Sequence, residues 1–571
     1  MAVHFRNSII LSKRLFTLVS LAFLAYLTEG KERIAHPNII IFFADNLGYE
    51  DIGVFQSDKN PKTRTPNIDQ LAAEGLKFTN WNSAAALCSA SRASLLTGKY
   101  PVRTGVFPGV FHPDASNGLL PEELTIAEYL KEVGYNTKIV GKWHLGHQEK
   151  FLPTNQGFDS WYGIPYHMAG GSLDNHLCGF DTNRTIWLPL FEDTQIIQQP
   201  VDLSNLAERY VENTKEFIDM SIREEKPFFL YFPFSHVHHL CAPQLATCQW
   251  ASKPFSKYSP NATFYDAVEE MDWILGEIVS YLDHKNISEE TFIQFTSDNG
   301  PALAQQSCSG SKGPFKGKWF EKNAPDSCIA CPKDYTPAPT EERPHRCTAE
   351  PLNMGLYEVD GVPCGEDVGL GSCWEANNIM PAVARWPGTI PSGKTDVMVS
   401  TLDILPTILD LLRLEARQEI DGQSILPLLT ETVDRNADHR DGRILYFWRD
   451  GFEDGPLPPP FGRFDVVAAK FGRIKAWIYT KSAHYNSDKE VFHDPPLLFD
   501  IIADPAEEIP LDPEEHKKAI DKILFSIDQH KRTISYGNPL TLDNDPRNFP
   551  CFNKDTNCRT DFLEPRQTEE S

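Results

Sequence analysis

The chain has 571 residues, of which 41% are hydrophobic and 23% charged, with 35 Gly, 43 Pro and 12 Cys. This ordinary globular composition excludes a disordered, collagen-like or coiled-coil protein, and the length suffices for a large α/β core with one appended domain. The formal net charge is −25. Such an acidic chain argues against a nucleic-acid-binding protein, because binding to a phosphate backbone requires clustered Lys and Arg.

The first thirty residues predict a cleaved signal peptide. Arg6, Lys13 and Arg14 precede an apolar run at 15–27, and small residues follow at 28–30. The run is shorter than the roughly 20 apolar residues that a membrane span needs, so we expect no membrane span after cleavage. We therefore assign the protein to the secretory pathway, extracellular or lysosomal. Three N-x-S/T glycan acceptors agree with this assignment: Asn183, Asn261 and Asn286.

In a secreted protein, cysteines favour disulfides over zinc or redox chemistry. Residues 302–372 carry many of them, are rich in Gly and Pro, and contain no periodic segment, which predicts a long loop insertion. The expected disulfide network, whose pairing stays open, comprises Cys308, Cys328, Cys331, Cys347, Cys364 and Cys373.

From about residue 37 to 430, apolar strand-like runs alternate with amphipathic helical stretches, which is typical of a large, mostly parallel sheet flanked by helices. We expect helices near 121–133, 204–225 and 263–282. Four predicted strands end in polar residues, where ligands of open α/β sheets bind. These strands are 38–44, 137–140, 227–232 and 291–296. Later runs at 379–386 and 402–412 continue the strand and helix pattern.

After residue 430 the pattern shifts to shorter strands at 443–447 and 473–479 and a helix near 513–530. We predict a smaller C-terminal α+β domain. The expected organisation is a signal peptide at 1–30, a catalytic α/β domain at 31–430 and this second domain at 431–571.

Asp45-Asn46 follows the first predicted strand, and Asp298-Asn299 follows a later one. Carboxylate and amide oxygens are the ligands that Ca²⁺ and Mg²⁺ prefer. Each pair by itself also fits an Asx turn at a strand exit. Their repetition at equivalent places favours a metal site.

The segment from Leu87 to Gly98, LCSASRASLLTG, resembles the signature of the sulfatase family, in which Cys-x-(Pro or Ala)-x-Arg is followed by Leu-Thr-Gly. The resemblance extends over nearly all of the mature chain and looks closest to animal arylsulfatase A-like and galactosamine-sulfatase-like enzymes. It implies an alkaline-phosphatase-like fold and hydrolysis of an aryl or carbohydrate sulfate ester. The further matching motifs are ADNLGY at 44–49, TPNID at 65–69, GKWHLG at 141–146, GIPY at 163–166 and FTSDNG at 295–300.

The resemblance also implies a covalent mechanism. In the family, a formylglycine-generating enzyme oxidises the signature cysteine, here Cys88, and the hydrate of formylglycine attacks sulfur with one hydroxyl and expels sulfate with the other. Four further residues would hold a divalent ion together with residue 88, Ca²⁺ being favoured over Mg²⁺. By family match these are Asp45, Asn46, Asp298 and Asn299.

Family match assigns the remaining site residues. Arg92, one helical turn after Cys88, would stabilise the nucleophile. Lys142 would bind sulfate, and His144 would take the proton when sulfate leaves. The general acid that protonates the leaving alcohol would be His238, with His236 as the alternative.

Three positions depart from the family pattern. Asn46 replaces an aspartate, and His167, which we assign to substrate binding, stands where a serine is common. Leu370 occupies the position of a sulfate-binding lysine. The candidates to supply the positive charge of that missing lysine are Lys316 and Lys318.

Two functional classes follow. The first is a sulfohydrolase acting on a sulfated small molecule or glycan, and the intact signature favours it. The second is a secreted protein of the same fold with weak or no catalysis, which binds sulfated glycans or serves in extracellular matrix. A homo-oligomer is compatible with either class.

Overall fold

The computed structural model describes residues 36–57, 63–170, 188–240, 249–252, 255, 263–303, 308–323, 357–359, 362–364, 368–430, 442–448, 465–480, 491–538, 540 and 548–550. The predicted signal peptide, the glycan acceptors Asn183 and Asn261, and three of the cysteines in the expected network lie outside these residues. The third acceptor, Asn286, is exposed after a helix. Within the described residues, no helix is both long and apolar enough to cross a bilayer.

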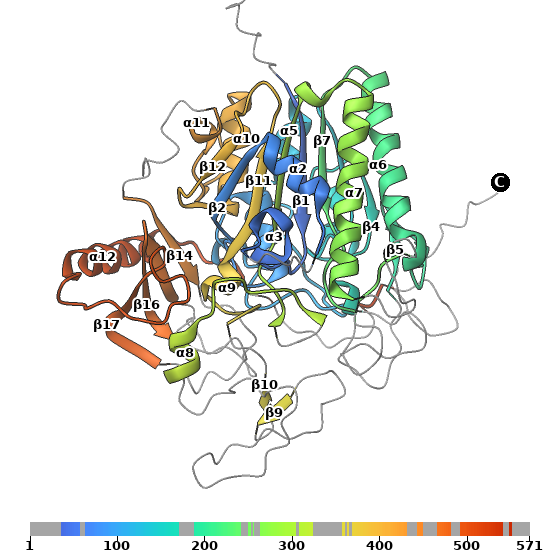
Figure 1. Ribbon diagram of the computed structural model, residues 1–571. Coiled ribbons are helices and arrows are strands. Elements are labelled where there is room, and N and C mark those ends of the chain that lie inside the picture. Colours follow the sequence, from blue (N-terminus) through green and yellow to red (C-terminus); the bar gives the residue numbers. More distant parts are fainter. Residues whose placement is uncertain are drawn as a thin grey trace, which may run out of the picture. The chain divides into compact units, whose positions relative to one another are not determined.

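An eleven-stranded sheet forms the centre of the unit that begins at Asn38 (Figure 1). Its strand order is β12-β2-β11-β8-β1-β7-β3-β4-β5-β6, with β13 paired to β2. The strands are β1 (Asn38–Ala44), β2 (Leu76–Asn82), β3 (Asn136–Val140), β4 (Ser160–Gly163), β5 (Leu190–Glu192), β6 (Gln195–Gln198), β7 (Phe228–Pro233), β8 (Thr291–Ser297), β11 (Ile379–Arg385), β12 (Gly393–Thr395) and β13 (Val399–Ser400).

The middle of this sheet is parallel. Strand β1 pairs in parallel with β8 and β7, β7 with β3, and β3 with β4. Strand β11 runs antiparallel to both β8 and β2, and β5 and β6 add antiparallel pairs at the other edge. Every residue of β1 is buried, as expected of a central strand covered on both faces. The predicted mixed, mostly parallel sheet is confirmed.

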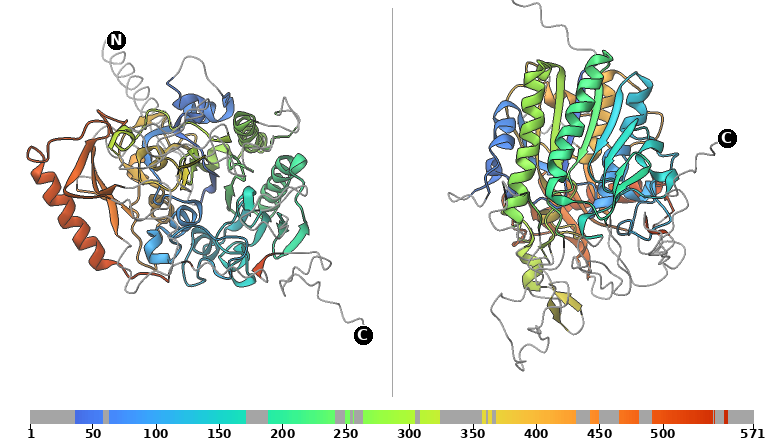
Figure 2. Two further views of the ribbon diagram at one scale, coloured as in Figure 1. Left: turned by 90° about the horizontal axis from the view of Figure 1, so that it is seen from below. Right: turned by 90° about the vertical axis from the view of Figure 1, so that its right-hand side faces the viewer.

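Helices cover the sheet. The helices α2 (Pro66–Glu74), α6 (Leu206–Arg223) and α7 (Phe264–His284) contribute to one apolar cluster with Ile40 and Phe42 of β1. Figure 2 shows α6 and α7 side by side. Ile41, which lies between these two residues of β1, points to the opposite face of the sheet, because successive side chains of a strand alternate. The remaining helices of this region are α3 (Cys88–Thr97), α4 (Pro101–Thr104), α5 (Ile126–Glu132), α10 (Ile404–Leu412) and α11 (Leu426–Leu429).

One predicted helix boundary and one strand differ between the sequence prediction and the structure. Helix α5 begins at Ile126 instead of 121, because Thr125 and Glu128 form a capping box that defines its first turn. The sequence analysis also missed β2, whose apolar residues are mixed with Lys77, Thr79 and Asn80. Polar side chains of this kind hide the alternation on which strand prediction depends.

A four-stranded antiparallel sheet forms the C-terminal region, in the order β14-β15-β16-β17. Its strands are β14 (Ile444–Trp448), β15 (Val466–Phe471), β16 (Ile474–Thr480) and β17 (Val491–Asp500). Helix α12 (Lys517–Thr533) packs on this sheet through Ile520, Ile523 and Ile527. The predicted α+β character of this region is therefore confirmed.

The described residues of the segment 302–372 include regular elements. They contain helix α8 (Lys318–Asn323) and an antiparallel hairpin of β9 (Tyr357–Val359) and β10 (Val362–Cys364), so the prediction of a segment without regular elements is wrong there. Cys308 is disulfide-bonded. Including Cys373 in the network was wrong, because its thiol packs in an apolar cluster and donates to the carbonyl oxygen of Trp448 at 3.7 Å.

Candidate active site

Parallel strand ends bring the two Asp-Asn pairs together. Ala44 and Ser297 are partners in the register of β1 and β8, so Asp45 and Asp298 leave the sheet side by side. The contact continues beyond the strands, since the Asp298 amide donates to the carbonyl oxygen of Ala44 and the Asn46 amide donates to Asp298 Oδ1, each at 3.1 Å. The neighbouring ends of β7 and β3 deliver the histidine segment and Lys142 to the same edge of the sheet. The four predicted strands with polar ends are thus parallel neighbours, in the order β8-β1-β7-β3.

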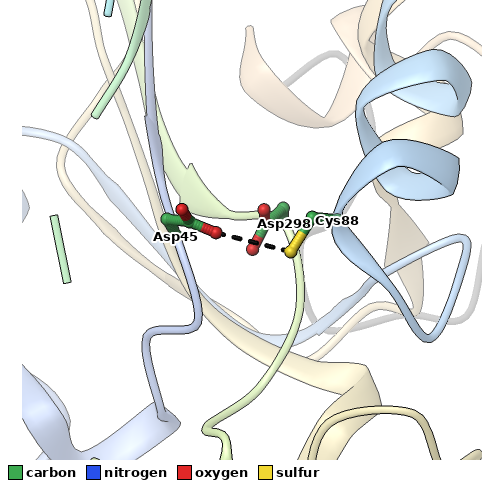
Figure 3. Close-up of side chains that lie close together, drawn as sticks. All are labelled: Asp45, Cys88 and Asp298. Carbon is green, nitrogen blue, oxygen red and sulfur yellow. Dashed lines mark hydrogen bonds between the residues drawn. The ribbon is translucent and has the colours of Figure 1, made fainter. Parts of the chain in front are cut away.

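Cys88 is the first residue of α3 and is buried beside these carboxylates (Figure 3). Its Sγ lies 3.5 Å from Asp45 Oδ1 and 3.6 Å from Asn46 Oδ1. One ligand atom each of Asp45, Cys88 and Asp298 lies within 4.8 Å of the other two. Burial raises the pKa of the Cys88 thiol well above its usual value, so the unmodified cysteine is a neutral thiol.

Two buried cations neutralise the two carboxylates. Arg92 Nη2 lies 2.7 Å from Asp298 Oδ2 and 3.4 Å from Asp45 Oδ1. Lys142 Nζ lies 2.7 Å from Asp45 Oδ2. Burial would raise the pKa of Asp45, but the charges of Lys142 and Arg92 outweigh it and lower that pKa. With both carboxylates ionised, the two cations leave this buried set without net charge.

The oxygen atoms present fit a hard cation. Asn299 Oδ1 is buried and has no hydrogen-bond partner among the described residues. The amide of Asn299 donates through Nδ2 to Asn46 Oδ1 at 2.7 Å, which keeps both amides at the cluster. Carboxylate and amide oxygens converging in this way match the ligand preference of Ca²⁺ and Mg²⁺.

His144 has one ring nitrogen available for proton transfer. Its Nε2 is 3.1 Å from the carbonyl oxygen of Phe111, which can only accept, so Nε2 carries a hydrogen. Within the described part of the chain the buried Nδ1 has no partner. Burial, reinforced by the charge of Lys142, lowers the pKa of His144 well below its usual value, so Nδ1 is a free acceptor at neutral pH.

Three further histidines form a row of rings beside His144. The ring of His167 stacks on His238 with centroids 4.6 Å apart, and His238 stacks on His239 at 4.4 Å. His144 meets His167 edge-on at 5.4 Å. Nδ1 of His238 donates to the carbonyl oxygen of His239 at 2.7 Å, which leaves its Nε2 for a ligand. The structure thus brings the sequence-predicted His144, His167 and His238 together.

His236, the alternative general acid, makes a different contact. Its Nε2 lies 3.0 Å from Glu270 Oε2, a buried carboxylate on α7. The backbone of His236 accepts from the Asp45 amide at 3.0 Å. The sequence analysis missed Glu270, although an acid among the apolar positions of a helix was an available signal.

The segment around Leu370 lies beside the start of α3. The Leu370 amide donates to the carbonyl oxygen of Pro301, and the Gly371 amide donates to that of Ala86, each at 3.0 Å. Lys318, one of two lysines proposed to replace a missing charge, forms an ion pair with Glu508 at 2.8 Å. Lys318 is therefore engaged by the C-terminal region.

Comparison with known proteins gives a consistent result. The sequence profile described as Sulfatase matches residues 37–414, and the one described as the C-terminal region of aryl-sulfatase matches 444–560. Arylsulfatase A of Homo sapiens is 32% identical over 492 residues, which cover 82% of each chain. N-acetylgalactosamine-6-sulfatase of Canis lupus familiaris is 30% identical over 546 residues, covering 88% of this chain and 87% of that protein.

The fold agrees with these sequence matches. The crystal structure of the PsFucS1 sulfatase from Pseudoalteromonas sp. superimposes with a TM-score of 0.67 at 24% identity, covering 91% of this chain and 94% of that one. The profile matches span both the large sheet and the C-terminal sheet. The chain therefore belongs to the sulfatase family and is a sulfuric ester hydrolase.

Proposed function

We propose that this enzyme hydrolyses the sulfate ester of an aryl or carbohydrate alcohol with formylglycine at position 88 as the nucleophile. Asp45, Asn46, Asp298, Asn299 and residue 88 hold Ca²⁺ in this proposal, with Mg²⁺ as the alternative ion. The observation that carries it is the position of Cys88 Sγ, 3.5 Å from Asp45 and 3.6 Å from Asn46.

The ion held by these residues would supply a Lewis acid for a sulfate oxygen, and formylglycine at position 88, as its hydrate, would offer one hydroxyl for attack on sulfur and a second for the later release of sulfate. Arg92 holds Asp298 and Asp45 in position through its buried ion pairs. Lys142 binds a sulfate oxygen with its ammonium group, which is already held at the site by Asp45. These cations reduce the repulsion between the anionic ester and the nucleophile.

Histidines move the protons. His144 accepts a proton at its free Nδ1 when sulfate leaves. His238 protonates the leaving alcohol oxygen from Nε2 as an imidazolium, because its Nδ1 hydrogen is already donated to the carbonyl oxygen of His239. Burial lowers the pKa of His238 well below its usual value, so the proton on Nε2 is taken up together with the anionic ester. His167 stacks on the ring of His238 and contacts the substrate from the neighbouring loop.

Two relatives support the substrate class by their names, since one is an arylsulfatase and the other acts on an N-acetylgalactosamine sulfate. We further propose that the chain enters the secretory pathway through the segment 1–30 and is modified there by a formylglycine-generating enzyme. The catalytic domain then comprises 31–430, and 431–571 forms the smaller second domain. The mature enzyme acts in an extracellular or lysosomal compartment.

A second candidate, a glycan-binding or matrix protein with weak catalysis, is favoured by one observation. The Gly371 amide donates to the carbonyl oxygen of Ala86, two residues before Cys88, so the segment that carries Leu370 in place of the lysine expected by family match lies near the start of α3. A leucine cannot neutralise sulfate. Catalytic activity separates the two candidates.

The test uses the secreted full-length protein. Mass spectrometry of the peptide that contains residue 88 should show formylglycine, and Cys88→Ala should abolish turnover of a chromogenic aryl sulfate. Cys373→Ala is the matched control, because Cys373 also carries a buried thiol but lies in another cluster, and this variant should stay active. Full activity of Cys88→Ala would refute the mechanism, and unmodified, inactive wild type would favour the second candidate.

A further inference from the structure

We propose that Asn377 is a positioning residue of the active site, whose amide group fixes the loop that leads into Cys88 relative to the loop that carries Asn299. The inference rests on the proposed function, because it concerns the nucleophile and one metal ligand of that proposal. Asn377 belongs to helix α9 (Glu375–Asn378) and is fully buried.

The side-chain amide of Asn377 joins three backbone segments. Its Nδ2 donates to the carbonyl oxygen of Ala86 at 3.0 Å and to that of Ser372 at 2.8 Å. Its Oδ1 accepts from the amide of Gly300 at 2.9 Å. Ala86 lies two residues before Cys88, and Gly300 directly follows Asn299. The Asn377 amide thus uses both of its donor hydrogens and its acceptor oxygen, and it links the loop before Cys88 to the loop after Asn299.

Gly300 and α9 approach each other closely. A Cβ atom at Gly300 would collide with the carbonyl oxygen of Ala376 and with Cα of Asn377. The Gly300 amide also donates to the backbone carbonyl of Asn377 at 3.0 Å. The loop after Asn299 therefore packs directly on α9, and a change in the Asn377 side chain acts on it without an intervening group.

Helix α9 provides a rigid base for this contact. The carboxylate of Glu375 binds Lys470 at 2.7 Å and Lys475 at 2.9 Å, both from the C-terminal sheet and both fully buried. Burial would raise the pKa of Glu375, but these two ammonium groups hold it at about 2, so the ion pairs persist at neutral and acidic pH. Lys470 also donates to Asn82 of β2 at 2.8 Å. Figure 1 shows α9 at the lower end of β2, next to the C-terminal sheet.

The arrangement has a measurable consequence. Without the Asn377 amide, the carbonyl oxygens of Ala86 and Ser372 lose a buried donor, and the two loops lose the side-chain bridge between Ala86 and Gly300. The hydroxyls of Ser83 and Ser91 still donate to the carbonyl oxygen of Asp298, so the loops stay in contact but are less precisely placed. Substitution of a residue that orients the ligands of a metal typically lowers metal affinity or activity about 10- to 100-fold. Asn377 contacts neither the nucleophile side chain nor a metal-ligand side chain in the hydrogen bonds described, so its effect is one of position.

The experiment compares Asn377→Ala with Asn378→Ala. Asn378 is the next residue of the same helix and is equally buried, but its amide donates to the carbonyl oxygen of Cys373 at 2.5 Å, away from both loops. Calorimetric Ca²⁺ affinity, kcat, KM and Tm are measured on the secreted full-length proteins. Mass spectrometry confirms that position 88 is equally converted in each.

We expect Asn377→Ala to weaken Ca²⁺ binding and lower kcat on the order of 10-fold or more each, and Asn378→Ala to change neither. Asn377→Asp keeps the side-chain shape but directs a second acceptor at two carbonyl oxygens, and it should reproduce the loss if the Ala variant does not fold. Wild-type Ca²⁺ affinity and kcat in the folded Asn377 variants would overturn the positioning role alone. A wild type that binds no Ca²⁺ would overturn both this role and the proposed metal site.

Discussion

The imidazole rings of His167 and His238 lie face to face, with centroids 4.6 Å apart and planes inclined by 13°. His167 follows β4 and His238 follows β7, so the stack joins two loops that leave different strands of the sheet. His238 is held on its other face by His239. The stack holds the plane of the His238 ring, and the hydrogen bond from its Nδ1 to the carbonyl oxygen of His239 leaves Nε2 to face a leaving group.

The first prediction concerns the general acid. His238→Ala should lower kcat/KM for a carbohydrate sulfate by about 100- to 10,000-fold, because the leaving alcohol then departs without a proton. The loss should be much smaller for a nitrophenyl sulfate, whose leaving oxygen needs little protonation. Steady-state kinetics with both substrates measure the difference.

His236→Ala provides the comparison for that experiment. The His236 ring pairs with Glu270 and not with the row of rings, so its removal should affect both substrates to the same degree. If His236→Ala instead reproduces the dependence on the leaving group, then His236 is the acid and our assignment is wrong.

The second prediction concerns metal affinity. Asn46 Oδ1 lies at the cluster with two carboxylates, so Asn46→Asp adds a third anionic ligand and should tighten Ca²⁺ binding on the order of 10-fold. Calorimetry measures the affinity. Asn155→Asp makes the same change in net charge at an exposed position before β4 and should leave the affinity unchanged. An unchanged or weaker affinity in Asn46→Asp would exclude Asn46 as a ligand.

The third prediction concerns the missing lysine. A charged hydrogen bond to a buried sulfate contributes on the order of 1.5–3 kcal/mol, equivalent to about 10- to 150-fold in kcat/KM. Leu370→Lys should therefore raise kcat/KM within this range, because the segment lies against Ala86. Lys318→Ala should be nearly neutral, since Lys318 pairs with Glu508.

Lys316→Ala tests the other candidate for that charge. A loss of activity in Lys316→Ala comparable to the predicted gain would show that Lys316 already supplies the cation. Near-neutral results for all three variants at high wild-type activity would mean that position 370 is not part of the sulfate pocket.

The fourth prediction concerns stability at acidic pH. His147 is buried and its Nε2 bonds to the carbonyl oxygen of Asn548, while burial lowers its pKa to about 4. In the unfolded chain the pKa is about 6.5, so between these values only the unfolded state takes up the proton. Stability is therefore unaffected by His147 above pH 6.5 and falls as the pH decreases towards 4, by up to about 3 kcal/mol.

His147→Gln isolates this effect, because the glutamine keeps a donor for Asn548 but does not titrate. The decrease in Tm between pH 7 and pH 4 should be smaller in the variant than in the wild type. Equal decreases in the two proteins would contradict a neutral, buried His147.

Local sequence patterns were sufficient for part of the fold. Continuous apolar runs identified β1, β7 and β8, because central parallel strands are buried on both faces and admit few polar residues. Strands β2 and β17 carry polar and charged residues among apolar ones and escaped prediction. Strand order and the antiparallel placement of β11 depend on contacts between distant segments, which no local pattern encodes.

The residues of the site likewise fall into those that short sequence motifs identified and those that only tertiary contacts identified. From the sequence, Cys88 with Arg92 and Lys142 with His144 came from motifs that resemble those of the sulfatase family, and the short spacing within each motif allows both members to face one site. Only the tertiary structure separated His236 from His238, paired Lys318 with Glu508 and placed Asn377 between two loops. These outcomes depend on which buried charge or carbonyl group lies opposite each side chain, and in a packed interior residues far apart in the chain supply that partner.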